Sequence, residues 1–147
     1  MGEGTGVRAG RAAFMARPLH TSPPMLRALA WLQGVFYVLT GLWPIVHMPS
    51  FEWVTGPKVD DWLVKTVGLL ITVIGAVLLV AARRGRIGPE IVLLAVGSAG
   101  GLAAVDAIYA LSDRISDIYL MDAIAEIALV ILWIVAWLRE KRLRPAV

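Results

Sequence analysis

Four apolar runs dominate the chain, at about 26–47, 61–82, 89–111 and 117–138. Each is close to the ~20 residues with which an α-helix crosses the ~30 Å hydrocarbon core of a bilayer. None alternates apolar and polar positions over ~10 residues, as the strands of a membrane β-barrel do. The pattern therefore predicts an all-α membrane protein, a four-helix transmembrane bundle.

Helix-breaking and capping residues mark the ends of these runs. Pro89 suits the first turn of a helix, and Asp60 or Asp61 can cap the second span. Pro44 should kink or stop the first span. The connection at 83–88 is short, which predicts that the second and third spans are antiparallel neighbours.

Composition supports a membrane environment. Hydrophobic residues make up 59% of the 147 residues and charged residues 17%, against roughly 25% charged in typical soluble domains. The mean hydropathy is +0.75. A soluble core of this size cannot bury so much apolar side chain, so a lipid bilayer is the expected partner. Cysteine is absent, which excludes disulfides, thiolate metal ligands and cysteine nucleophiles.

Basic residues gather at the ends of the apolar runs. Because they are not interleaved with aromatic residues, the net charge of +3 indicates membrane topology rather than nucleic acid binding. Most of the 14 basic residues fall on one side, which the positive-inside rule makes cytoplasmic together with both termini (N-in/C-in). Interfacial tryptophans are expected at Trp31, Trp133 and Trp137 on that side and at Trp43 and Trp62 on the other.

Residues 1–24 are rich in Gly, Arg and Pro and are predicted to be a disordered basic tail. Two alternatives stay open at this point, because translation could also begin at Met15 or Met25.

Four ionisable residues lie inside the apolar runs, all toward the predicted extracytoplasmic ends: Lys65, Asp106, Asp122 and Glu126. Charges at that depth are costly and usually face a partner, a bundle interior or a wet cavity. Asp122 and Glu126 are spaced i, i+4 and share a helix face. They should not both be ionised there without a nearby cation or water. These four residues are the core of a predicted polar pocket.

Polar and small residues on three spans are expected to face the same interior. Lys65 continues as a stripe through Gly68, Thr72 and Gly75, so it is either the counter-ion of the carboxylates or a side chain that reaches outward to the headgroups. Gly97 and Gly101 form a GxxxG, interpreted as packing within the bundle. Two further rows are Gln33, Tyr37, Thr40, Pro44 and His47 on the first span, and Ser98, Leu102, Asp106, Tyr109 and Asp113 along the third. From these rows Tyr37, Thr40 and Tyr109 join the predicted pocket.

The connection at 48–60 is predicted to form an aromatic lid over this pocket, with an interfacial anchor as the alternative. Thr-Gly-Pro-Lys at 55–58 indicates a tight turn. The proposed lid residues are Phe51, Glu52, Trp53, Lys58 and Asp61, with Trp62 beside them. A single His47 among scattered carboxylates is a poor zinc site, so no metal and no cofactor are predicted.

The run Gln33…Tyr37…Thr40-Gly41…Trp43-Pro44, followed by Phe51-Glu52…Val54-Thr55-Gly56-Pro57-Lys58…Asp61 to Gly68, resembles small uncharacterised bacterial four-span membrane proteins. The resemblance covers about 26–140 and is most specific over 33–75. It implies a bacterial inner-membrane protein and brings no activity or functional residues with it.

Three functions remain as hypotheses. The first is a non-enzymatic protein whose extracytoplasmic pocket binds a small or lipidic ligand, or which serves as a subunit of a membrane assembly or homo-oligomer. The second is a membrane enzyme acting on a lipid or isoprenoid, with Glu126 as acid/base and Lys65 as its electrostatic partner. The third is a proton-coupled transporter or channel, which would need oligomerisation because the predicted cytoplasmic halves lack ionisable groups.

Overall fold

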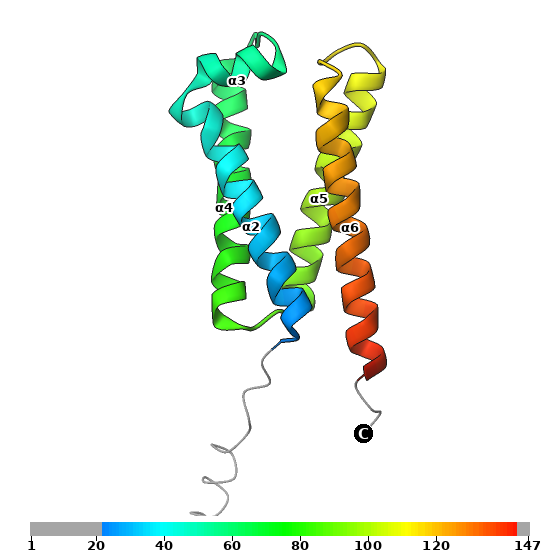
Figure 1. The fold of residues 1–147 in the computed structure, drawn as a ribbon. Helices are drawn as coiled ribbons and strands as arrows, with labels where there is room; N and C mark the ends of the chain where they lie inside the picture. Colours follow the sequence, from blue (N-terminus) through cyan, green and yellow to red (C-terminus); the bar gives the residue numbers. More distant parts are fainter. Residues whose placement is uncertain (1–21, 144–147) are drawn as a thin grey trace, which may run out of the picture.

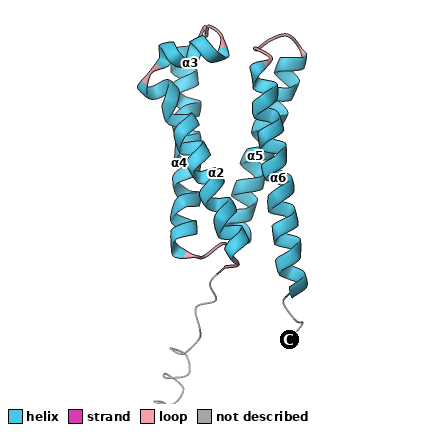
Figure 2. Cartoon of the chain, in the orientation of Figure 1, coloured by secondary structure: helices cyan, strands magenta, loops and turns pink. Residues whose placement is uncertain are grey.

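The computed structural model describes residues 22–143, and the described part is helical with turns and no strands. Its helices are α2 Pro24–Val46, α3 Met48–Thr55, α4 Asp61–Arg84, α5 Pro89–Leu111 and α6 Ile118–Leu143 (Figures 1 and 2). The four long helices are each long and apolar enough to cross a membrane. The predicted all-α bundle of four transmembrane helices is therefore confirmed.

The ends of the long helices lie close to the predicted ones, but two of these helices are longer than predicted and one short helix was not predicted. α4 and α6 continue past the predicted ends to Arg84 and Leu143. Pro44 lies within α2, which stops two residues later at Val46. The sequence did not predict α3 at 48–55. This helix has eight residues, about two turns, and is too short to stand out by periodicity.

The start of the described chain docks onto the α4–α5 connection. The Ser22 hydroxyl accepts a hydrogen bond from the Ile87 backbone N–H at 2.7 Å, and the Ser22 N–H donates to the Gly85 carbonyl at 2.8 Å. The predicted disordered tail therefore extended too far, since residues 22–24 are ordered. Its remainder, 1–21, lies outside the described residues.

The helices associate as two pairs. α2 packs mainly on α4, and α5 packs mainly on α6. α4 and α5, predicted as antiparallel neighbours across the short connection at 85–88, do contact each other, but each has its main packing partner elsewhere. The two pairs stand close together at the end that carries Pro24 and Leu143 (the terminal end) and diverge toward the end that carries α3 (the α3 end) (Figure 1).

Glycines set the closeness of the α2/α4 pair. A Cβ on Gly41 would lie 2.5 Å from the Gly68 carbonyl oxygen, and one on Gly75 would lie 2.8 Å from the Gly34 carbonyl oxygen. No side chain fits at these crossing points, so backbone packs on backbone. The predicted stripe through Gly68, Thr72 and Gly75 thus does face another helix.

Alanines set the closeness of the α5/α6 pair. The buried face of α5 carries Ala95, Ala99, Ala103 and Ala110 with Asp106 among them. The predicted packing role of Gly97 and Gly101 is wrong within the chain: both are exposed, and a Cβ on either would meet no atom within 4 Å. The alanine face, about half a turn away on the opposite side of α5, is the buried one instead.

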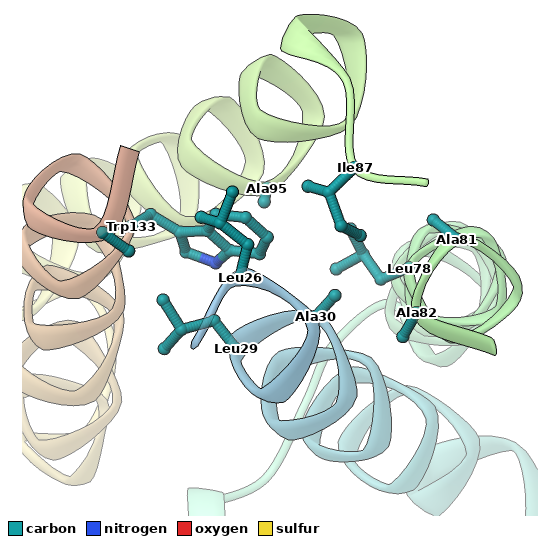
Figure 3. Packing of buried hydrophobic residues seen from close by; sticks show 10 residues of the cluster. Leu26, Leu29, Ala30, Leu78, Ala81, Ala82, Ile87, Ala95 and Trp133 are labelled. Carbon is teal, nitrogen blue, oxygen red and sulfur yellow. The ribbon is translucent and has the colours of Figure 1, made fainter. Parts of the chain in front are cut away.

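The apolar core lies at the terminal end. Ten buried residues from all four long helices and the α4–α5 connection form it (Figure 3): Leu26, Leu29, Ala30, Leu78, Ala81, Ala82, Ile87, Ala95, Trp133 and Ala136. Trp133 is fully buried, so its predicted place in an interfacial belt is wrong. This core joins the two pairs at one end and leaves the α3 end free to open.

Candidate functional site

A cavity of about 410 Å³ lies between the two helix pairs in the α3 half of the bundle. All four long helices line it, together with α3 and the turn that follows. It exists because the glycine contacts hold α4 against α2 and the alanine contacts hold α6 against α5, while the pairs themselves diverge. Of the predicted pocket residues, the structure places Tyr37, Thr40, Asp106, Asp122 and Glu126 on its walls.

A hydrogen bond between the two pairs forms the cavity floor. The Tyr37 hydroxyl of α2 donates to Glu126 Oε2 of α6 at 2.9 Å. Tyr37 is completely buried and Glu126 is 1% exposed. A carboxyl group at that depth needs a donor, and the tyrosine supplies it. This contact gives the buried Glu126 carboxyl group a structural partner and holds it beside the cavity.

Asp106 differs from Glu126 because it has no such donor. Its side chain is 7% exposed and lines the cavity, and its Oδ2 atom has no hydrogen-bond partner. The Asp122 carboxyl group lies beside it and is only partly buried. An unsatisfied buried acceptor costs roughly 1–3 kcal/mol. Asp106 therefore places a buried acceptor next to the cavity, and no donor from residues 22–143 reaches it.

Aromatic side chains and one lysine form the mouth at the α3 end. Phe51 of α3 packs edge-on against Trp43, with ring centroids 5.6 Å apart. The Lys58 ammonium lies 4.9 Å from the centroid of Tyr119 on α6 and 5.9 Å from that of Phe51. It also donates to the Thr55 carbonyl oxygen at 2.9 Å. Lys58 thus reaches from one helix pair to the other across the mouth.

The predicted lid residues differ in where the structure places them. Phe51 and Lys58 line the cavity. Glu52 does not line it but accepts a hydrogen bond from the Lys58 backbone N–H at 3.0 Å, which fixes the turn. Trp53 is 88% exposed, and Asp61 is exposed in the first turn of α4. Neither of these two residues lines the cavity.

Two predicted pocket residues lie elsewhere. Lys65 is exposed and does not line the cavity. The cavity-facing side of α4 is the row Val64, Val67 and Ile71, and Lys65 is turned about 100° away from Val64. Its exposed position agrees with the second alternative, a side chain that reaches outward from the bundle. Tyr109 is 51% exposed and also points away, since Asp106 and Ala110 occupy the buried face of α5.

Most of the apolar lining was missed. Tyr119 precedes Asp122 and Glu126 by three and seven residues, so its helical spacing could have placed it on their face. Phe36 lies one turn before Thr40, whose hydroxyl donates to the Phe36 carbonyl oxygen at 2.8 Å. The other missed lining residues gave no signal, because they are ordinary aliphatic residues of a span or, for Ile115, of the α5–α6 connection: Leu63, Val64, Val67, Ile71, Val105 and Ile115.

The cavity has an apolar opening toward the surroundings of the bundle. Leu63 and Val67 of α4 and Val105 of α5 line it and are 47%, 42% and 51% exposed. All three lie within the candidate membrane spans. Lipid chains rather than water therefore face this gap between α4 and α5.

A second polar contact joins the pairs nearer the terminal end and is fully satisfied. Gln33 Nε2 donates to the Ala95 carbonyl oxygen at 3.0 Å, and Gln33 Oε1 accepts from Trp133 Nε1 at 2.7 Å. Gln33 is completely buried. It ties α2 to α5 and α6, and it closes the bundle below the cavity.

Two further candidate places carry less chemistry. A surface hollow of about 460 Å³ between α4 and α5 at the terminal end is lined by aliphatic residues with Arg84, Arg86 and Glu90, none of them buried. His47 accepts a hydrogen bond from the Ser50 N–H at 3.2 Å as the N-cap of α3. Over residues 22–143, no three His, Asp or Glu side chains cluster as metal ligands.

Searches for similar proteins define no family for this chain. No protein-family model, curated protein or solved structure matches it. The four apolar helices identify an integral, multi-pass membrane protein with a lipid bilayer around it.

Proposed function

We propose that this chain is a membrane-embedded binding protein whose inter-pair cavity holds a small or lipidic ligand. The observation that carries the proposal is Asp106, a buried acceptor without a partner on the wall of a cavity of about 410 Å³. Cavities of roughly 300–1,000 Å³ with mostly apolar walls and few polar groups are typical ligand sites. A ligand with a polar head would satisfy Asp106.

The opening between α4 and α5 supports a ligand that arrives through the bilayer. The exposed lining residues there are aliphatic, so a polar solute gains nothing by entering between them. The mouth at the α3 end is crossed by Lys58. An amphiphile could place its apolar part toward Val67 and Val105 and its head toward Asp106.

We further propose the predicted orientation, with both termini cytoplasmic and the cavity in the extracytoplasmic half of a bacterial inner membrane. The basic residues beyond the terminal end, such as Arg83, Arg84 and Arg139, support it. Reporter fusions placed after Gly56 and after Leu143 test it, with the first expected outside and the second inside.

The two other hypotheses receive less support. The enzyme reading keeps the cavity but loses Lys65 as the partner of Glu126, and Glu126 is already engaged by Tyr37. The channel reading is opposed by the apolar core and by Gln33, which close the terminal half in a single chain.

A cavity-filling variant tests the proposal. Val105→Trp puts an indole into the cavity, whereas Ile108→Trp puts one on a residue that is 62% exposed and lines no part of it. Protein purified in mild detergent would be compared by native mass spectrometry and solvent extraction. We expect a non-covalent adduct in wild type and Ile108→Trp that is depleted in Val105→Trp. The same adducts in all three proteins would contradict the proposal.

A further inference from the structure

The charge balance of the cavity wall is one-sided. Asp106, Asp122 and Glu126 all line it, and Lys58 at the mouth is the only basic side chain of the described residues that does so. In residues 22–143 no lysine or arginine forms an ion pair or hydrogen bond with these three carboxyl groups. The Lys58 ammonium is held by the Thr55 carbonyl oxygen and two rings. The wall therefore has acceptors in excess of donors.

The excess of acceptors is concentrated at one atom, Asp106 Oδ2. Asp106 Oδ2 is buried and receives no hydrogen bond from an N–H or hydroxyl group of residues 22–143. The Asp122 carboxyl group beside it can share a proton with Asp106 but supplies no positive charge. In a site surrounded by lipid, such a pair is stabilised by a positive charge placed against it. A neutral donor would satisfy Oδ2 but leave the negative charge of the pair uncompensated, and an anionic head would add to that charge.

The rest of the wall fits a cation with an apolar body. Phe36, Phe51 and Tyr119 contribute rings, and ring faces attract ammonium groups when these lie within about 6 Å. Lys58 already uses two of them in this way, at 4.9 and 5.9 Å. Aliphatic residues such as Leu102 and Val64 complete the wall. A bare metal ion would not use these surfaces.

We infer that the cavity takes a lipophilic organic cation, an amine or quaternary ammonium whose positive head lies at Asp106 and Asp122 with its apolar body along the aromatic and aliphatic wall. This rests on the proposed binding function and names the chemical class of its ligand.

The test uses two probes of the same shape. Benzyltrimethylammonium carries the positive charge, and neopentylbenzene is its uncharged carbon isostere. Saturable binding to the full chain in lipid nanodiscs would be measured by equilibrium dialysis, with empty nanodiscs as background. We expect the cation to bind at least about tenfold more tightly than the isostere, which corresponds to about 1.4 kcal/mol.

Variants tie the preference to the cavity. Asp106→Asn keeps the shape and removes the charge, and it should weaken cation binding about tenfold without weakening that of the isostere. Asp113→Asn is the matched control, because Asp113 is exposed in the α5–α6 connection and its φ of 54° suits Asn. If Asp106→Asn does not fold, Asp122→Asn provides the same comparison.

The outcomes separate the two proposals. Equal binding of both probes, unchanged in Asp106→Asn, would overturn the cation inference and leave the binding function standing. An equal loss of cation binding in Asp113→Asn would mean that surface charge alone causes the loss, and it would also overturn the cation inference. Saturable binding of neither probe would count against both proposals.

Discussion

The two polar contacts that join the helix pairs differ in how completely the buried polar groups around them are hydrogen-bonded. At the terminal end, Gln33 satisfies both ends of its amide through Ala95 and Trp133, and an apolar core surrounds it. Toward the α3 end, Tyr37 satisfies Glu126, but Asp106 beside them is left without a donor next to a cavity. The first contact stabilises the bundle. The second region retains a polar atom at a cost in stability, which is typical of binding sites.

The comparison also explains why one chain can hold both regions. Contacts within the α2/α4 and α5/α6 pairs predominate, with glycines at the crossing of α2 and α4 and alanines on the buried face of α5. The pairs meet firmly only where the core lies. Divergence from that point creates the cavity without breaking any contact within a pair.

The largest expected effect lies in the terminal core. Trp133→Ala removes a completely buried side chain and the donor of Gln33, and it should lower the free energy of unfolding by about 3–5 kcal/mol. Trp53→Ala, at a residue that is 88% exposed, should change it by less than about 0.5 kcal/mol. Unfolding in mixed micelles, followed by circular dichroism, measures both. Equal effects would remove the distinction between core and surface.

The next effect tests the tightness of the α2/α4 pair. Gly41→Ala forces a Cβ to within 2.5 Å of the Gly68 carbonyl oxygen, which should destabilise the protein by about 1–3 kcal/mol. Gly101→Ala meets no atom within 4 Å and should leave stability unchanged or slightly raised. The same unfolding assay applies. A loss at Gly101→Ala as large as at Gly41→Ala would mean that the exposed glycines of α5 pack against a second copy or another membrane protein.

The smallest effect lies at the floor of the cavity. Tyr37→Phe removes the donor to Glu126 and should cost about 0.6–1.7 kcal/mol, the range for hydrogen bonds between membrane helices. Tyr109→Phe is the matched control at a residue that is 51% exposed and should behave as wild type. If the two substitutions had the same effect, the Tyr37–Glu126 contact would not hold the pairs together.

Hydropathy alone predicted the four spans, because their length and apolar content are set by the bilayer. It could not predict α3, whose eight residues carry no span-length pattern. Nor could it indicate that α4 packs mainly on α2, since the short connection between α4 and α5 constrains only the ends of those two helices. That pairing depends on where Gly34, Gly41, Gly68 and Gly75 meet across helices.

The residues of the candidate site also divide into those that the sequence could predict and those that it could not. Asp106, Asp122, Glu126 and Tyr37 were predictable, because a polar residue inside a span has to face the interior or a cavity. Lys65 was misplaced because its long side chain can lie at the edge of a helix face and remain exposed. The cavity itself was not predictable, since it results from the angle between two helix pairs.

The central claim is that Gln33 is retained for stability and Asp106 for binding. The most direct test is the free energy of unfolding of Gln33→Leu and Asp106→Leu, measured side by side in the same bicelles. Gln33→Leu leaves the Trp133 N–H without its acceptor and should lose about 1–2 kcal/mol. Asp106→Leu removes an unpartnered carboxyl group beside a cavity with room for the larger side chain, and it should keep or gain up to about 1 kcal/mol. A loss in Asp106→Leu equal to that in Gln33→Leu would contradict the account.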